Sequence, residues 1–388
     1  MMIDANGTQL HVSQRGDGEL AVVFLHYWGG TARTWSPVLD ALPADLKAVA
    51  LDARGWGQSA RPENGYDMVT QADDVAAVIA QLGLSRYVLV GHSMGGKVAQ
   101  LLASRCPIGL QGVLLVAPSP AQGKALAADE KQAMLGAYTH TQAVAATLDH
   151  VLAGSPLPAA LREQVIADSV AGAASAKSHW PAMGLAQDVS ADLGRIDVPV
   201  HILVGEHDRV DAVSLMREVV QPSIRGADLQ VVSGAGHLLP LEAPQAVAAA
   251  VLDLVGRAIH AAGHGTARPE ALPAAFDDAL NAGDLERVMA LFDPRAVMRM
   301  TDGTTVAEGH AALRGGLAGL LSMRPTLQNR VRRVLVSDDV ALLLLDWTIR
   351  LHSPDQGEIT QRGTATQVAQ RGGDGQWRLR ISNPLGLA

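Results

Sequence analysis

The stretch 87–102, YVLVGHSMGGKVAQLL, constrains the fold more than any other part of the chain. Residues 87–90 are short, apolar and β-rich, which predicts a buried parallel strand, and residues 97–102 continue with apolar side chains at helical spacing. Ser93 lies on the turn between them, with a glycine two residues away on either side. Glycines permit a strained turn that lifts the serine hydroxyl out of the sheet, and the helix start offers free N–H groups to an anion. We therefore interpret Ser93 as a nucleophile.

Length and composition limit the classes of protein to which the chain can belong. Its 388 residues predict two domains, and 48% hydrophobic with 18% charged residues is typical of a globular protein. No apolar run is long enough to span a bilayer and the start of the chain lacks export features, so we expect a cytoplasmic location. A net charge of −8 without a basic cluster argues against nucleic acid or a membrane as partner. We expect a small-molecule substrate.

Cysteine and histidine usage points away from disulfide and metal chemistry. The single cysteine, Cys106, excludes an intrachain disulfide. The histidines show no metal-ligand spacing. We expect neither a cofactor nor a metal site.

A second loop supplies a candidate oxyanion donor. Residues 20–25 read as a strand ending in HYWGG, at the sheet edge where open α/β folds bind ligands. We assign the two oxyanion donors to the backbone N–H groups of Trp28 and of Met94, which follows the nucleophile. The rings of Tyr27 and Trp28, with His92 beside the nucleophile, are candidate substrate contacts.

The remaining part of the first 258 residues alternates strands with helices, which predicts a mostly parallel, doubly wound α/β sheet. Asp52 and Arg54 are expected to form a charge-assisted pair. Between 119 and 194 the pattern becomes helical and Ala-rich, with no convincing strand. An insertion after a strand edge would lie over the active site as a cap, and Trp180 within it is a further candidate substrate contact.

Two further polar residues follow later strands. Strand 200–204 leads to Asp208 and strand 229–232 leads to His237, both at the expected edge of Ser93. A serine hydroxyl is a weak nucleophile, so a neutral imidazole must take its proton and a carboxylate must orient that imidazole. Asp208 is the preferred carboxylate, although Glu206 and Asp211 are close in sequence and remain alternatives.

These motifs together resemble the α/β-hydrolase superfamily over residues 1–258, on HYWGG, DARGWGQS, GHSMGG, VGEHD and GAGHLLPLEAP. Serine enzymes of the esterase and perhydrolase group are the nearest match. The resemblance implies Ser93 as nucleophile, His237 as base and then acid, and Asp208 as its orienting carboxylate. A dehalogenase or epoxide hydrolase of this fold would resemble the pattern only with Asp at position 93. Tyr27 stands where such loops commonly have glycine, which is expected to narrow the acyl pocket.

The C-terminal part has a different rhythm. Residues 259–269 read as a linker, and residues 270–388 place helices before an antiparallel meander, which predicts an α+β domain. LNAGDLERVMALFDP, EGHAALR and the closing GTATQVAQRGGDGQWRLRISNPLG resemble a SnoaL-like, ketosteroid-isomerase-like cone fold. Every tyrosine lies in the first part, so a tyrosine-based oxyanion pair is unavailable here. Candidate pocket residues of this domain are His310, Asp346, Trp347 and His352.

We expect a serine hydrolase that cleaves a small, largely apolar carboxylic ester or lactone through an acyl-enzyme on Ser93. Carbon–carbon hydrolysis and perhydrolysis use the same residues and remain open. Two alternatives are polyketide-type or steroid-type cyclase or isomerase chemistry in the C-terminal domain, and a ligand sensor with slow turnover. For that domain we favour a non-catalytic role, either joining two chains as a homodimer or contributing a ligand pocket.

Overall fold

The computed structural model describes residues 1–18, 20–107, 109–262, 265–300, 303–353, 357–372 and 375–386. The chain divides into two compact units, Met1–Arg257 and Ala258–Ala388. The α/β sheet lies in the first unit, and a second, separate sheet lies in the other.

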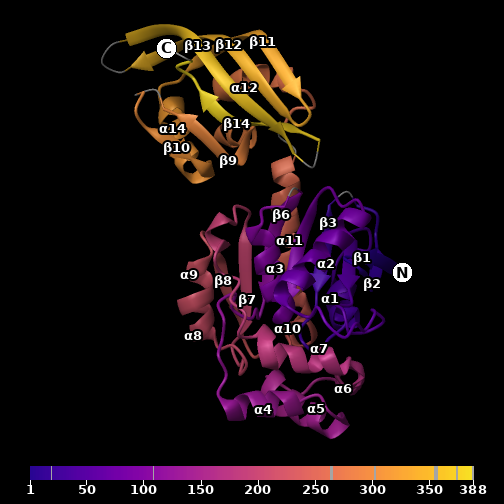
Figure 1. Ribbon diagram of the computed structural model, residues 1–388. Coiled ribbons are helices and arrows are strands. Elements are labelled where there is room, and N and C mark those ends of the chain that lie inside the picture. The colour runs from indigo at the N-terminus through magenta and orange to yellow at the C-terminus, as the bar shows by residue number, and fades with distance from the viewer. Residues whose placement is uncertain are drawn as a thin grey trace. The chain divides into compact units, whose positions relative to one another are not determined.

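The first unit is built on an eight-stranded sheet in the order β1-β2-β4-β3-β5-β6-β7-β8 (Figure 1). From β4 to β8 neighbouring strands are parallel, while β1 and β2 join antiparallel at one edge. The strands are β1 Met2–Ala5, β2 Thr8–Arg15, β3 Ala21–Leu25, β4 Lys47–Leu51, β5 Tyr87–His92, β6 Leu110–Val116, β7 Val200–Gly205 and β8 Asp228–Val232.

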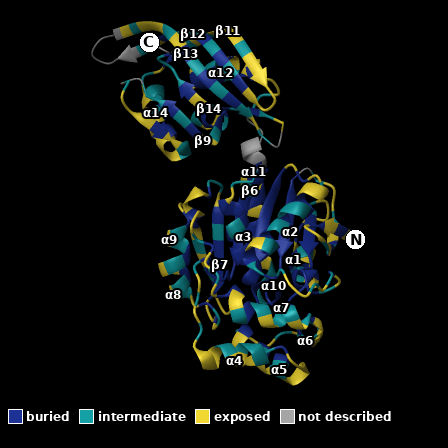
Figure 2. Ribbon diagram, in the orientation of Figure 1, coloured by how far each residue is buried: buried dark blue, intermediate teal, exposed yellow. Residues whose placement is uncertain are grey.

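The central strands are covered on both faces. Every residue of β3 and β5 is buried, which explains why these segments read as continuous apolar runs rather than as alternating patterns. Figure 2 shows the central strands of this unit mostly in the dark blue of buried residues. Helices α1 Ser36–Ala41, α2 Met68–Gln81, α3 Met94–Ser104 and α10 Leu239–Glu242 belong to this unit, with short helices α8 Val213–Leu215 and α9 Gln221–Ser223 between β7 and β8. Helix α11 Pro244–Ala262 begins in this unit and extends beyond its last residue, Arg257. The sequence-based expectation of a doubly wound, mostly parallel sheet is confirmed.

The insertion after β6 forms a helical cap. It contains α4 Ala128–Gly136, α5 Thr141–Thr147, α6 Ala159–Ala171 and α7 Ala174–His179, with π-helical turns η2 Leu148–Leu152 and η3 Trp180–Gly184. These helices lie together at one end of the first unit (Figure 1). No residue of 119–194 belongs to a strand, as the sequence pattern indicated.

The second unit is an α+β domain with its own hydrophobic core. Its six-stranded sheet has the order β10-β9-β14-β13-β12-β11, and among the described residues Leu343, Leu379 and Phe292 are fully buried in that core. Helices α12 Leu272–Asn281, α13 Leu285–Ala290 and α14 Gly309–Ser322 complete the domain. The strands are β9 Phe292–Arg299, β10 Val306–Glu308, β11 Thr326–Ser337, β12 Val340–Ser353, β13 Gly357–Arg371 and β14 Trp377–Asn383.

Three sequence-based expectations need correction. Arg54 does not pair with Asp52: both ends of its guanidinium contact the Asp74 carboxylate, at 2.6 Å and 2.5 Å, because α2 brings that buried residue closer. The sequence pattern predicts a helix over 284–292, but Phe292 begins β9, where it pairs with Leu379 of β14. The expected linker 259–269 begins inside α11, which continues through Ala262.

The C-terminal part of the predicted linker 259–269 is paired with a strand. Thr266 forms an isolated antiparallel bridge with Trp377, so this part of the segment pairs within the second unit. Among the described residues, no helix is both long enough and apolar enough to cross a membrane.

Candidate active site

The turn between β5 and α3 adopts the strained geometry expected of a nucleophile elbow. Ser93 has φ 52° and ψ −112°, a backbone conformation that non-glycine residues rarely adopt. A β-carbon on Gly91 would lie 2.4 Å from the carbonyl oxygen of Gly95, and one on Gly95 would lie 2.5 Å from that of Leu25. Only glycine fits at either position, so the two bracketing glycines allow α3 to approach the sheet.

Three side chains that are distant in sequence converge at this turn. The Ser93 Oγ lies 2.9 Å from His237 Nε2, and His237 Nδ1 lies 2.9 Å from Asp208 Oδ2. An ionised carboxylate only accepts hydrogen bonds, so the imidazole proton is on Nδ1 and the unprotonated Nε2 accepts the Ser93 hydroxyl proton. This is the arrangement in which a serine can be deprotonated as it attacks.

The surroundings adjust the charges of this group. Burial lowers the pKa of His237, but the neighbouring carboxylates, first among them Asp208, outweigh burial and raise that pKa above its usual 6.5. Burial raises the pKa of Asp208, while His237 and the backbone N–H groups of Val210 and Asp211 outweigh it, so that this pKa is lowered. The carboxylate of Asp208 therefore stabilises the protonated form of the His237 imidazole.

The geometry distinguishes Asp208 from the two other candidate carboxylates. Glu206 is exposed and accepts hydrogen bonds from Ser233 Oγ and the Gly234 N–H. Asp211 is buried, and its carboxylate lies 3.2 Å from Lys124 Nζ. Of the three, Asp208 alone is hydrogen-bonded to the His237 ring.

The loop after β3 carries the candidate second oxyanion donor. Its peptide between Tyr27 and Trp28 is held at the carbonyl end: Tyr27 O accepts from His26 Nδ1 at 2.7 Å and from the Gly30 N–H at 3.0 Å. The His26 tautomer follows from its other nitrogen, because Nε2 accepts from the Ala53 N–H at 3.0 Å. Both lone pairs of the carbonyl are engaged, so the direction of the Trp28 N–H is restricted.

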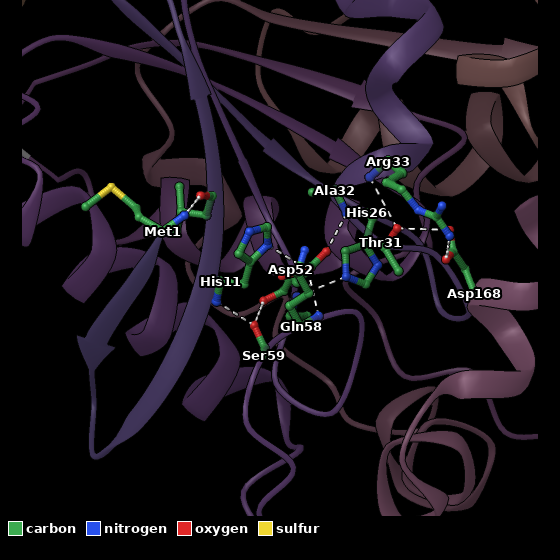
Figure 3. A network of polar contacts seen from close by, with 12 residues as sticks. Met1, His11, His26, Thr31, Ala32, Arg33, Asp52, Gln58, Ser59 and Asp168 are labelled. Atoms are coloured by element: carbon green, nitrogen blue, oxygen red, sulfur yellow. Dashed lines mark hydrogen bonds and ion pairs between the residues drawn. The ribbon is translucent and has the colours of Figure 1, made fainter.

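Asp52 ties this loop to its neighbours (Figure 3). Its Oδ1 accepts from the Ala32 N–H at 2.6 Å, and its Oδ2 from the Gln58 N–H and from His11 Nδ1, both at 2.9 Å. Asp52 is thus the buried anchor of loops 26–34 and 52–59. This is a structural role, and it accounts for part of the DARGWGQS motif.

The other predicted site residues are placed as follows. Tyr27 is buried, and its ring centroid lies 5.1 Å from that of His92. His92 has no exposed surface: its Nε2 donates to the His237 carbonyl at 2.8 Å and burial lowers its pKa to about 3. Such burial argues against the expected substrate contact at His92. It favours a structural role in which His92 supports the loop that carries His237, the histidine loop. Trp180 is buried at the start of η3, against Gly184.

Three residues that the sequence pattern did not single out contact either the candidate oxyanion loop or the loop that carries His237. Tyr138 and Ser169, both from the cap, donate hydrogen bonds to backbone carbonyls of the candidate oxyanion loop. Glu242 accepts hydrogen bonds from the N–H groups on either side of His237, those of Gly236 and Leu238. Glu242 belongs to the quoted motif GAGHLLPLEAP, whereas nothing local in the sequence marks Tyr138 or Ser169.

The candidate pocket residues of the C-terminal domain have structural partners. Asp346 forms ion pairs with Arg330 and Arg332, and Trp347 Nε1 donates to the Pro384 carbonyl at 2.7 Å. His310 Nε2 lies 3.1 Å from the Phe292 carbonyl. The His352 side chain falls outside the described residues. In the described part of the chain, no group of three or more His, Cys, Asp or Glu side chains is arranged to hold a metal ion.

Comparison with known proteins extends these observations. The alpha/beta hydrolase family matches residues 22–250, and the SnoaL-like domain matches residues 274–378. The 2-(acetamidomethylene)succinate hydrolase of Mesorhizobium japonicum is 26% identical over 65% of this chain and 94% of that relative. The non-heme haloperoxidase of Rhodococcus erythropolis is 28% identical over 60% and 90%.

Solved structures show the same fold for the first part of the chain. An esterase from Exiguobacterium antarcticum superposes with a TM-score of 0.60 at 24% identity, covering 66% of this chain and 99% of that one. The enol-lactonase from Burkholderia xenovorans LB400 has a TM-score of 0.59 at 22% identity, covering 66% and 100%. The elbow, the converging triad side chains and the family match lead to one conclusion: the chain belongs to the alpha/beta hydrolase family and is a hydrolase, with a SnoaL-like domain at its C-terminal end.

Proposed function

We propose that the chain is a serine esterase that cleaves a small, largely apolar carboxylic ester or lactone through an acyl-enzyme on Ser93. The observation that carries the proposal is the hydrogen-bonded chain from Ser93 Oγ through His237 to Asp208, with both links at 2.9 Å. A serine nucleophile forms an ester with the acyl group of its substrate, which water then hydrolyses.

The reaction follows from this geometry. Ser93 Oγ attacks the substrate carbonyl as His237 Nε2 takes its proton, and the oxyanion that forms is stabilised by the N–H groups of Trp28 and Met94. The imidazolium then protonates the leaving alcohol, leaving the acyl group on Ser93. Water attacks the acyl-enzyme with His237 again as base, which releases the acid and restores the serine.

The preference for small apolar acyl groups rests on the surroundings of the elbow. The loop after β3 carries the rings of Tyr27 and Trp28, and the Tyr138 ring stacks on that of Trp28, so the candidate oxyanion donor has aromatic surroundings. Such surroundings favour an apolar substrate, and a charged acyl chain would lose its hydration without a partner. Some relatives are named as hydrolases of other bonds, including the soluble epoxide hydrolase of Corynebacterium sp., but Ser93 here supports acyl transfer.

The test is covalent labelling combined with turnover. The protein is treated with a fluorophosphonate and its mass is measured, and p-nitrophenyl acetate, butyrate and octanoate are assayed for a burst of p-nitrophenol. We expect one adduct on Ser93, faster hydrolysis of acetate and butyrate than of octanoate, and loss of both adduct and turnover in Ser93→Ala. An unlabelled wild-type protein, or full turnover by Ser93→Ala, would refute the proposal. Lactone substrates tested in parallel decide between the two ester classes.

For the C-terminal domain we propose pairing of two chains. Its edge strand β11 and the adjoining start of β12 expose four large apolar side chains, a pattern that proteins normally cover. These are Val331, Leu335, Val336 and Val340. The structural partners of Asp346, Trp347 and His310 give no specific support to isomerase or cyclase chemistry in this domain.

A further inference from the structure

The cap makes direct contact with the loop that carries the candidate oxyanion donor. Tyr138, just after α4, donates from its hydroxyl to the Trp28 carbonyl at 3.0 Å, and its ring stacks on the Trp28 ring with centroids 4.1 Å apart. Ser169 of α6 donates to the next carbonyl, that of Gly29, at 2.9 Å. Two consecutive carbonyls of the loop are therefore bonded to side chains more than 100 residues away in sequence.

These contacts are close and dry. Tyr138 is 2% exposed and Ser169 is fully buried. Gly29 has φ +102°, and a β-carbon there would lie 2.5 Å from the Tyr138 ring and 2.9 Å from Ser169 Oγ. The cap side chains pack on the bare backbone of the loop, so their position and the path of the loop depend on each other.

A third cap residue holds the far end of the same loop. The Asp168 carboxylate accepts from Thr31 Oγ1 at 3.0 Å and forms an ion pair with the Arg33 guanidinium (Figure 3). Asp168 is mostly buried, whereas Arg33 reaches solvent. From Trp28 to Arg33, the loop is fastened to α6 and to the turn after α4.

The cap also holds the histidine loop. The His237 N–H donates to the carbonyl of Leu152, the last residue of η2, at 2.8 Å. Glu242 links the cap to the histidine loop, since its Oε1 accepts from the Gly154 N–H of the cap at 2.7 Å and its Oε2 from the Gly236 N–H of the loop at 3.1 Å. The cap thus bonds to both loops on which the proposed mechanism depends.

We propose that the cap is a built-in part of the catalytic machinery, with Tyr138 and Ser169 acting as positioning residues that aim the oxyanion donor of Trp28. Because the cap is hydrogen-bonded to both the oxyanion loop and the histidine loop, it cannot move as a rigid body without disturbing both. The inference rests on the proposed function, because an oxyanion donor matters only if acyl transfer occurs at Ser93. Tyr138 and Ser169 need not touch the substrate for this role.

The test uses variants that remove one hydroxyl and keep the packing. Tyr138→Phe removes the phenol hydroxyl while retaining the ring stack, and Ser169→Ala removes the hydroxyl that donates to Gly29 and that also forms a hydrogen bond with the Tyr27 side chain. Thr147→Val is the matched control, because Thr147 Oγ1 bonds only within the cap, to the Ala143 carbonyl. Each full-length variant is assayed for the rate constant and the final extent of fluorophosphonate labelling, and for inhibition by phenylboronic acid.

Complete loss of one oxyanion donor costs about 10²–10³-fold in turnover. A misaimed donor should cost less, so we expect about tenfold slower labelling and about tenfold weaker boronate inhibition for each single variant, and a larger loss for the double variant. The final extent of labelling stays complete in every variant, since the triad is untouched. Thr147→Val labels at the wild-type rate.

The outcomes separate this inference from the proposed function. Wild-type protein that does not label at all refutes the function itself. Complete labelling of Tyr138→Phe and Ser169→Ala at wild-type rates, with unchanged boronate inhibition, overturns the positioning role alone. The positioning role is also overturned if Thr147→Val slows labelling as much as Tyr138→Phe and Ser169→Ala do, because the slowing would then reflect general destabilisation of the cap. Thermal unfolding of each variant, measured in parallel, identifies any that fails to fold.

Discussion

Replacing Asp208 by Asn tests how the carboxylate sets the tautomer of His237. Asp208 Oδ1 accepts from the N–H groups of Val210 and Asp211, at 2.8 Å and 3.0 Å. In Asp208→Asn the single amide oxygen is needed for those two donors, which turns the NH₂ group toward His237 Nδ1. An NH₂ group donates, so the imidazole must move its proton to Nε2 and can no longer accept the Ser93 proton.

The magnitude follows from that exchange. A triad held in the wrong tautomer loses about 10⁴-fold in turnover, which corresponds to about 5 kcal/mol of transition-state stabilisation. The variant also removes the main charge that raises the pKa of His237. In the wild type, kcat/KM should rise with pH through an inflection above 6.5, because the base must be unprotonated. In Asp208→Asn the residual activity should reach its plateau at lower pH, since burial then dominates and lowers that pKa.

The assay is kcat/KM for p-nitrophenyl acetate from pH 5 to 9. Glu206→Gln is the matched control, as it neutralises an exposed carboxylate nearby whose hydrogen bonds go to Ser233 and Gly234 and not to the His237 ring. It should keep wild-type turnover and the wild-type inflection. The reasoning fails if Asp208→Asn retains more than a tenth of the activity, or if Glu206→Gln loses as much as Asp208→Asn.

Three further predictions concern stability and assembly. Arg54→Met leaves the buried Asp74 carboxylate without its guanidinium and should lower the free energy of unfolding, measured by urea titration, by about 3–5 kcal/mol. Arg105→Met is the control, because its ion pair with Asp73 is half-exposed, and it should lower that free energy by less than about 1 kcal/mol. Equal losses in the two variants would contradict the role of burial. Trp377→Ala empties part of the second core and should destabilise that unit by about 3–5 kcal/mol, measured by two-step thermal melting, while p-nitrophenyl acetate turnover persists. Simultaneous loss of turnover would show that the activity depends on the second unit. Leu335→Asp should convert dimers to monomers in sedimentation equilibrium, and a wild-type protein that sediments as a monomer would exclude chain pairing through β11.

The sequence alone was sufficient for the sheet, the cap and the candidate triad, because each rests on local patterns. Apolar runs of four to six residues became the strands β3 and β5, and the change to a helical, Ala-rich pattern from residue 119 marked the cap. Ser93, Asp208 and His237 each follow a strand of one parallel sheet, so topology brings them to the same edge. Because each of these residues directly follows a strand, the order of the chain alone places all three at the carboxyl edge of the sheet. The sequence could therefore predict them as one site although they are far apart along the chain.

The tertiary structure decided which partners each polar residue takes. Arg54 pairs with Asp74 and not with Asp52, because the approach of α2 is a packing outcome that sequence distance does not encode. His92 is turned inward to the His237 carbonyl, although its neighbour Ser93 faces the site. No local sequence pattern predicts the hydrogen bonds from Tyr138 and Ser169 to the candidate oxyanion loop, since the sequence around a hydroxyl does not show whether it faces solvent or a buried carbonyl. Local periodicity determines elements and edges, whereas hydrogen-bond partners depend on how close packing brings those elements together.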